Sequence, residues 1–405
     1  MVTAMVTAAA GYNESPFDVA RINFEASAGR VLTEPDLRLL LSSCSRDLRF
    51  ELPIRLDSGE LRLFHAFRTH HSSGRGPHLG ALRFAPDLSS GLMFALAQTL
   101  TWKAGLAEVH FAGSMGGVLC NPAELSVAEM ERITRAYVAC LQPLLGPFKD
   151  ILQLEPGANP RIADWIQGEY TAQLNLIPGA HCAESDPVAL ACVVGKAEGS
   201  GGLADGGQLE LRGVVALLRR IAEERGKTPA ELSVALYGAN GASRALAEVR
   251  QLGCKWIGAP ELRQTEAAAP EAALQAAADV LILAGGECAV NTGNVTKIVA
   301  PVIIEAADLS LTPVADMVLA QKGTIVIPSL VANAGAVIAA HLEWDANLRQ
   351  AGVGSKAAGN EIELRVLKAY DAVRRRATEC SQTLRAAAYD LALDRVAAVE
   401  RLRKP

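Results

Sequence analysis

The alternation of apolar and polar residues predicts that the first half of the chain mixes strands with helices. Residues 1–45 have a helical pattern, and residues 88–106 and 125–145 repeat apolar side chains at helical spacing. Residues 50–55 and 60–69 alternate apolar and polar positions on either side of Asp57, Ser58 and Gly59, which predicts a β-hairpin. We therefore expect an N-terminal α/β domain with a mixed sheet over residues 1–195.

Short apolar strands alternate with helical stretches in the second half. The glycine-dense segment 195–207 predicts a domain junction, and a helix is expected over residues 214–225. Strands are expected at residues 232–238, 255–259, 280–284, 302–305 and 324–328, with a helix at 242–252. This order is typical of a doubly wound, Rossmann-like parallel sheet, here over residues 196–350. Residues 361–402 predict one long helix, so residues 351–405 are expected to pack back on the first domain.

Composition narrows the class of protein. The chain has 405 residues, of which 50% are hydrophobic and 20% charged, and this supplies enough apolar material for two domains. No apolar run is long enough to span a bilayer and no basic stretch precedes a leader-like segment, so we expect a cytoplasmic protein without a membrane interaction. Its eight cysteines form no CxxC pair, which argues against a metal site, and a net charge of −5 argues against nucleic-acid binding.

The turn after the strand at 232–238 is a candidate dinucleotide site. Such a turn uses glycines to bend tightly and to let the pyrophosphate approach the backbone at a helix N-terminus. Gly238 and Gly241 are present here, whereas Asn240 stands where a glycine is expected, and Glu261 is the candidate partner for a ribose hydroxyl. The residues leave two alternatives open, namely a functional NAD or NADP site and a fold that has lost its cofactor.

A small-residue segment surrounds Met115. With a lysine at its centre, such a segment would supply an amine of lowered pKa for acid–base chemistry, which a thioether cannot supply. Taken alone, residues 110–117 are explained by a methionine that fills a gap in a glycine-rich turn.

A series of motifs nevertheless resembles one enzyme family. They are residues 70–73, 76–84, 101–103, 115–117, 169–170, 312–316, 328–335 and 342–344, together with Asn159 and Trp165. In this order they resemble the glutamate/leucine/phenylalanine/valine dehydrogenases, and among them the glutamate dehydrogenases most closely. The resemblance implies oxidative deamination of an L-amino acid with NAD or NADP, and a hexameric assembly.

The resemblance also assigns roles to single residues. Lys103 matches the lysine that holds the substrate α-carboxylate, and Asn333 belongs to the same amino-acid site. Met115 falls on the catalytic lysine, and Glu155 falls on the catalytic aspartate that moves the proton. An extra methylene displaces the carboxylate from its proton-transfer geometry. The catalytic motif is thus degraded.

Further departures concern ligand choice. Leu79 and Ala340 stand where glutamate-specific members have a lysine and a serine for the side-chain carboxylate, which favours an aliphatic ligand. Glu210 and Asp308 stand where the family uses a threonine and an asparagine, and both add negative charge near the expected cofactor.

Two functions follow from these comparisons of residues. The first is a regulatory subunit that senses a leucine-like amino acid in a complex with a catalytic glutamate dehydrogenase, with cofactor binding doubtful. The second is an active NAD(P)-dependent dehydrogenase of altered, aliphatic specificity. Several coincident losses favour the first, because one missing acid–base group already lowers a rate by about 10² to 10⁴.

Overall fold

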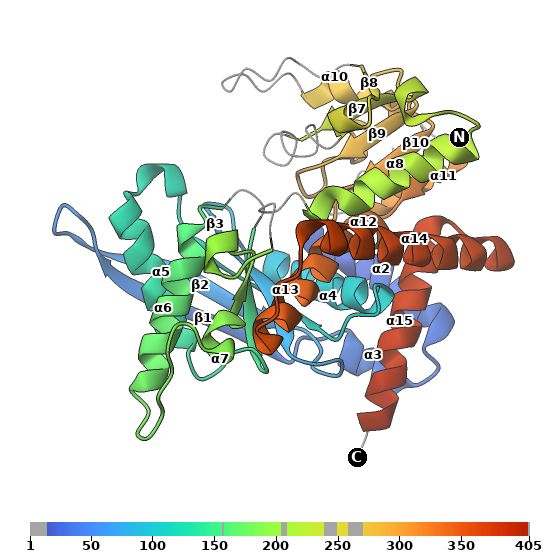
Figure 1. The fold of residues 1–405 in the computed structure, drawn as a ribbon. Helices are drawn as coiled ribbons and strands as arrows, with labels where there is room; N and C mark the ends of the chain where they lie inside the picture. Colours follow the sequence, from blue (N-terminus) through green and yellow to red (C-terminus); the bar gives the residue numbers. More distant parts are fainter. Residues whose placement is uncertain (1–13, 156–157, 204–208, 239–248, 258–269, 404–405) are drawn as a thin grey trace. The chain divides into compact units, whose positions relative to one another are not determined.

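Contacts divide the chain into two compact units. The computed structural model describes residues 14–155, 158–203, 209–238, 249–257 and 270–403 (Figure 1). Unit 1 comprises Met1–Pro35, Gln208–Ile338 and Gly359–Ala397, and unit 2 comprises Asp36–Gly207, Ala339–Ala358 and Ala398–Pro405. This grouping differs from the expected boundaries 1–195, 196–350 and 351–405, because the first 35 residues and most of the C-terminal helices belong to the unit with the parallel sheet.

Unit 2 is built on a mixed sheet of six strands, here called sheet A, in the order β1-β2-β4-β3-β5-β6. Its strands are β1 (Arg46–Arg55), β2 (Leu61–His70), β3 (His78–Ala85), β4 (Ala112–Leu119), β5 (Asp150–Leu154) and β6 (Val193–Val194). Strands β1, β2 and β4 pair antiparallel, and β4, β3, β5 and β6 pair parallel. The predicted hairpin is confirmed, since Arg55 pairs with Leu61 across its turn.

Helices cover both faces of sheet A. They are α3 (Pro35–Leu41), α4 (Ser90–Leu106), α5 (Val127–Leu141), α6 (Arg161–Asn175) and α7 (Pro187–Leu190), with the short 3₁₀ turns η1 (Pro122–Glu124) and η2 (Glu198–Ser200). A side chain at Gly113 would point into α4, whereas one at Gly116 would meet the Tyr137 hydroxyl of α5. Because residues of opposite parity on β4 face opposite sides, α4 and α5 lie on opposite faces. Helix α6 packs beside α5 (Figure 1).

Unit 1 contains a parallel sheet of five strands, sheet B, in the order β11-β10-β9-β7-β8. Its strands are β7 (Ser233–Tyr237), β8 (Lys255–Trp256), β9 (Val280–Leu283), β10 (Val302–Glu305) and β11 (Ile325–Ile327). The expected doubly wound sheet is thus confirmed, and each strand lies within or close to its predicted range. Of the predicted helix 242–252, residues 249–251 are described and helical, Leu252 lies in the turn that follows, and residues 242–248 lie outside the described residues.

The helices of unit 1 and of the chain's end complete the fold. They are α2 (Pro16–Val31), α8 (Arg212–Glu224), α10 (Pro270–Leu274), α11 (Pro313–Gln321), α12 (Ser329–Ala332), α13 (Ala334–Arg349), α14 (Ser355–Cys380) and α15 (Leu384–Arg403), with the 3₁₀ turns η3 (Leu209–Leu211), η4 (Pro229–Glu231) and η5 (Val295–Lys297). The single helix predicted at 361–402 is wrong. Helix α14 ends because Ser381 adopts a left-handed φ of 52°, and Thr383 then caps α15 by accepting a hydrogen bond from the Ala386 N–H at 3.2 Å.

Candidate functional site

Met115 lies in the middle of a buried strand, which corrects the expected turn. It belongs to β4, is 4% exposed, and pairs with Thr69 of β2. The glycines around it serve close packing: a Cβ on Gly113 would lie 1.9 Å from the Ala97 carbonyl oxygen of α4. The small residues therefore let a helix approach the strand closely.

Three of the sequence-predicted residues belong to sheet A and the helix on one of its faces. Leu79 of β3 pairs with Gly113 and is fully buried, and Met115 lies two residues further along the same side of β4. Lys103 belongs to α4, which packs on this face, and is 3% exposed. The face thus combines apolar side chains with one buried amine.

Glu155 follows the last residue of β5 and is held by an arginine. Its Oε1 accepts a hydrogen bond from Nε of Arg83 on β3 at 2.6 Å, and the two side chains are 28% and 23% exposed. Strand register explains this contact. Leu82 of β3 pairs with Leu154 of β5, so the residues that follow them, Arg83 and Glu155, lie side by side. The carboxylate at the predicted catalytic position is therefore directed toward Arg83.

A buried ionic cluster ties the strands of the candidate site together. Nε of Arg68 on β2 donates to Oδ2 of Asp150 on β5 at 2.8 Å, and its other nitrogens donate to the Ser114 hydroxyl at 2.8 Å and to the Ala81 carbonyl at 3.0 Å. Burial alone would raise the pKa of Asp150, but Arg68, together with His70 at 2.7 Å, holds it well below its usual range. This cluster connects β2, β3, β4 and β5.

His78 is a structural residue of the same region. It is 9% exposed, and its ring stacks on that of His70 with centroids 4.2 Å apart. Burial lowers its pKa to about 4, so it is neutral near neutral pH. A neutral imidazole stacked in the core is a poor candidate for a replacement acid.

Ala340 and Asn333 belong to different units and are described separately. Ala340 is a buried residue of α13 in unit 2, three residues before Glu343. Glu343 accepts hydrogen bonds from the Gly195 N–H at 3.1 Å and from Nζ of the buried Lys196 at 2.8 Å. In unit 1, Asn333 caps the C-terminus of α12. Sequence reasoning missed the Lys196–Glu343 pair, which joins residues 147 positions apart.

Sheet B carries the candidate cofactor turn at the point where strand order reverses, between β7 and β9. Gly238 adopts a φ of +129°, and a Cβ there would lie 2.8 Å from the backbone of Ala284 and Gly285. Only glycine fits this position, as the first residue of a dinucleotide turn requires. This described part of the turn fits NAD or NADP. Asn240, Gly241 and Glu261 lie outside the described residues.

Two further findings limit the chemistry. Among the described residues, no group of three or more histidine, cysteine or carboxylate side chains is arranged to hold a metal ion. Within the same residues, no helix combines the length and apolar character needed to cross a membrane.

Comparisons with known proteins agree with this architecture. The model of the Glu/Leu/Phe/Val dehydrogenase dimerisation domain matches residues 45–172, and the model of the Glutamate/Leucine/Phenylalanine/Valine dehydrogenases matches residues 233–403. The chain is 28% identical to the glutamate dehydrogenase of Thermotoga maritima, over 95% of this chain and 97% of that protein. It is 30% identical to glutamate dehydrogenase A2 of Halobacterium salinarum, over 88% and 90%.

Solved structures show the same fold. The hetero-hexameric glutamate dehydrogenase from Thermus thermophilus, in its Leu-bound form, has a TM-score of 0.87 and 28% identity, over 98% of both chains. The glutamate dehydrogenase from Peptoniphilus asaccharolyticus has a TM-score of 0.79 and 25% identity, over 96% of this chain and 99% of that one. The chain belongs to the Glu/Leu/Phe/Val dehydrogenase family.

Proposed function

We propose that the chain is a catalytically impaired, regulatory subunit of a hexameric glutamate dehydrogenase complex and that it binds a leucine-like L-amino acid. The observation that carries the proposal is Met115, which lies buried at the centre of β4 where the family resemblance puts the catalytic lysine. A thioether neither accepts nor donates a proton. Loss of one acid–base group lowers a rate by about 10² to 10⁴.

The carboxylate that remains does not compensate for this loss. Glu155 is one methylene longer than the family aspartate and is bonded to Arg83 at 2.6 Å. Proton transfer depends on a placement accurate to a fraction of an ångström, so a longer side chain fixed on an arginine is poorly suited to it. Two independent parts of the mechanism are thereby altered.

Leu79 and Ala340 support an aliphatic ligand. Both are apolar and buried, at positions where the resemblance expects groups that bind the γ-carboxylate of glutamate. An unpaired carboxylate against an apolar wall costs more than the roughly 2 to 7 kcal/mol that a buried amide or hydroxyl without a hydrogen-bond partner costs. Lys103 is retained to hold an α-carboxylate. The Thermus thermophilus relative is a hetero-hexamer solved in a Leu-bound form, which supports both a mixed assembly and this ligand class.

The alternative is an active dehydrogenase of aliphatic specificity, and two observations favour it. Lys103 is present, and Gly238 keeps the backbone conformation of a dinucleotide turn. In that case NAD or NADP would supply the hydride acceptor, with Gly238 next to its phosphates. We expect weak cofactor binding, because the sequence has Asn240 where the family has a glycine.

Two measurements test the proposal. Native mass spectrometry of the chain, expressed with and without a catalytic glutamate dehydrogenase subunit, should give a mixed hexamer; a chain that never enters such an assembly would refute the regulatory role. In thermal-shift assays of the purified chain, leucine should raise the melting temperature more than NAD or NADP, since only ligands that prefer the native state stabilise it. Stabilisation by NAD with none by any amino acid would favour the alternative.

A further inference from the structure

Arg385 of α15 forms a buried ion pair at the carboxyl end of sheet B. Its Nη1 donates to Oε2 of Glu305 at 2.9 Å, and its Nε lies 3.1 Å from Oδ1 of Asp316. The side chains of Arg385 and Glu305 are 9% and 0% exposed. Glu305 is the last residue of β10, and ligands of doubly wound sheets bind beyond the carboxyl ends of the strands. The ion pair therefore borders the loops that form ligand sites in such folds.

Glu305 connects Arg385 to the segment that carries Asn333. Oε2 of Glu305 also accepts a hydrogen bond from the Ser329 N–H at 3.0 Å, at the start of α12. The Ser329 carbonyl in turn accepts a hydrogen bond from the Asn333 N–H at 2.9 Å. One carboxylate and one backbone residue thus link Arg385 to Asn333.

Asn333 depends on contacts of this kind for its position. It is half-buried, whereas its neighbours Ala332 and Ala334 are buried. Helix α12, which it caps, has four residues, and a single helical turn has no stability of its own. The hydrogen bond from Ser329 to Glu305 is therefore one of the tertiary contacts that fix the helix and the residue at its end.

The strength of that hydrogen bond depends on Arg385. Burial raises the pKa of the Glu305 carboxyl group, and the positive charge of Arg385 opposes this rise. Burial also disfavours the charged form of Arg385, but Asp316 and Glu305 raise its pKa above the ordinary value, so the guanidinium stays charged. A charged acceptor forms a stronger hydrogen bond than a neutral one. Loss of Arg385 favours the neutral acid and so weakens the bond to Ser329.

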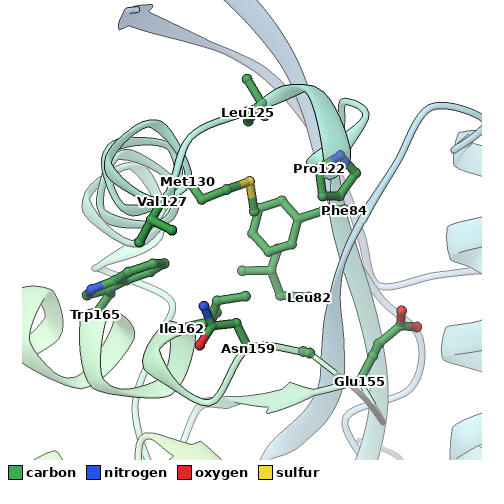
Figure 2. Close-up of a pocket in the computed structure, with 11 residues that line it drawn as sticks. Leu82, Phe84, Pro122, Leu125, Val127, Met130, Glu155, Asn159, Ile162 and Trp165 are labelled. Atoms are coloured by element: carbon green, nitrogen blue, oxygen red, sulfur yellow. The ribbon is translucent and has the colours of Figure 1, made fainter. Parts of the chain in front are cut away.

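The cavity where α5 and α6 approach β3 in unit 2 has no such network. It has a volume of about 400 Å³, and Figure 2 shows Leu82, Phe84 and Met130 in the middle of its lining. Among its described lining residues Glu155 is the only ionisable one; its side chain is 28% exposed and bonded to Arg83. Figure 2 shows this carboxylate pointing away from the apolar side chains. The cavity therefore lacks the buried ion pair found beside α12.

We propose that Arg385 is a positioning residue of the amino-acid site and that it acts through Glu305 and Ser329 to hold Asn333 toward the ligand. This role rests on the proposed function, in which the chain binds a leucine-like amino acid. It extends that function to α15, which lies outside the motifs of the family resemblance. Two of its contacts lie inside those motifs, namely Asp316 in residues 312–316 and Ser329 in residues 328–335.

Hydrogen–deuterium exchange of the full purified chain, followed by mass spectrometry, measures how firmly α12 is held. In Arg385→Met, the amides of residues 328–335 should exchange at least about tenfold faster, since this ratio corresponds to the loss of about one hydrogen bond to a charged group. Exchange in β9 should rise less, because only a general loss of stability in unit 1 accelerates both segments alike. Arg375→Met, the same substitution at an exposed position of α14, should change neither segment.

Calorimetric titration of the same proteins with leucine tests the role in binding. Arg385→Met should weaken leucine binding by about tenfold or more, and Arg375→Met should leave it unchanged. Arg385→Lys keeps the charge without the fork of donors, so it should recover part of both losses. Should Arg385→Met fail to fold by circular dichroism, Arg385→Lys decides, with α12 exchange expected to rise about threefold or more relative to β9.

Equal acceleration of α12 and β9 would show that Arg385 only stabilises unit 1 and would overturn the positioning role. Leucine binding that Arg385→Met leaves unchanged would overturn it as well. If the unaltered chain binds no leucine, the proposed ligand class fails, and exchange in α12 alone then decides whether Arg385 positions Asn333.

Discussion

Replacement of Arg68 by methionine should destabilise unit 2 strongly. The side chains of Arg68 and Asp150 are 0% and 1% exposed, and the substitution leaves the Asp150 carboxylate buried without its main counter-charge. Breaking a buried ion pair from one side costs about 3 to 5 kcal/mol, which is a large share of the roughly 5 to 15 kcal/mol that stabilises a domain. Arg62→Met on the same strand is the control, because Arg62 is exposed and its guanidinium only lies over the Phe64 ring at 4.8 Å. Arg62→Met should therefore lower the free energy of unfolding by no more than about 1 kcal/mol.

The pH dependence of the same variant follows from Asp150. In the unaltered chain the pKa of Asp150 is lower in the folded state than in the unfolded state. The ionised carboxylate therefore stabilises the fold fully at a pH above its unfolded-state pKa, and this stabilisation is lost as the pH falls through its folded-state pKa. Without Arg68, burial raises the pKa instead, and a raised carboxylate pKa makes the variant relatively more stable at low pH. The deficit in free energy of unfolding should therefore be smaller at about pH 4.5 than at about pH 7.5.

Urea unfolding followed by tryptophan fluorescence measures both effects, because Trp102, Trp165 and Trp344 belong to unit 2. The reasoning would be refuted if Arg68→Met and Arg62→Met lowered the free energy of unfolding equally. It would also be refuted if the deficit of Arg68→Met in that free energy grew at acid pH. The double variant with Asp150→Asn should recover part of the loss, since it removes the unpaired charge.

Three further outcomes follow from the structure. Gly113→Ala should abolish folding of unit 2, because the added Cβ would collide with α4. Gly199→Ala is the control and should fold normally, because the space around Gly199 is open. Circular dichroism compares the two variants, and similar melting curves would contradict the packing described. Lys196→Met should lower the free energy of unfolding, measured in urea, by about 3 to 5 kcal/mol, because the buried Glu343 carboxylate loses its counter-charge; a loss below about 1 kcal/mol would show that the pair is dispensable. Met115→Lys alone should not restore glutamate oxidation in a spectrophotometric assay, since the lengthened carboxylate and the apolar side-chain positions remain; a restored rate would place the whole defect in one residue.

Sheet B and the hairpin of sheet A could be predicted from the sequence because their signals are local. The strands of sheet B are short apolar runs such as Val280–Leu283, buried on both faces. Glycines such as those at 113 and 116 are typical of turns, so the sequence does not reveal strand β4; in the structure Gly113 permits close approach of α4, and Gly116 permits close approach of the Tyr137 hydroxyl. The break after Cys380 was missed because a serine, not a glycine, takes the left-handed position.

The candidate site could be predicted only in part. The positions of Met115, Leu79 and Glu155 came from the resemblance to a family. Their surroundings depend on strand register: Arg68 meets Asp150 across 82 residues, and Arg83 meets Glu155 across 72. No local pattern predicts such pairs, because a shift of one residue would turn either side chain to the other face.

The most direct test of the account is the initial rate of NAD- or NADP-dependent oxidation of glutamate, leucine and valine by the chain purified without any catalytic subunit. The account predicts no rate above background with any of the three amino acids. Robust turnover with any one of them would contradict it and would make the chain an active amino-acid dehydrogenase.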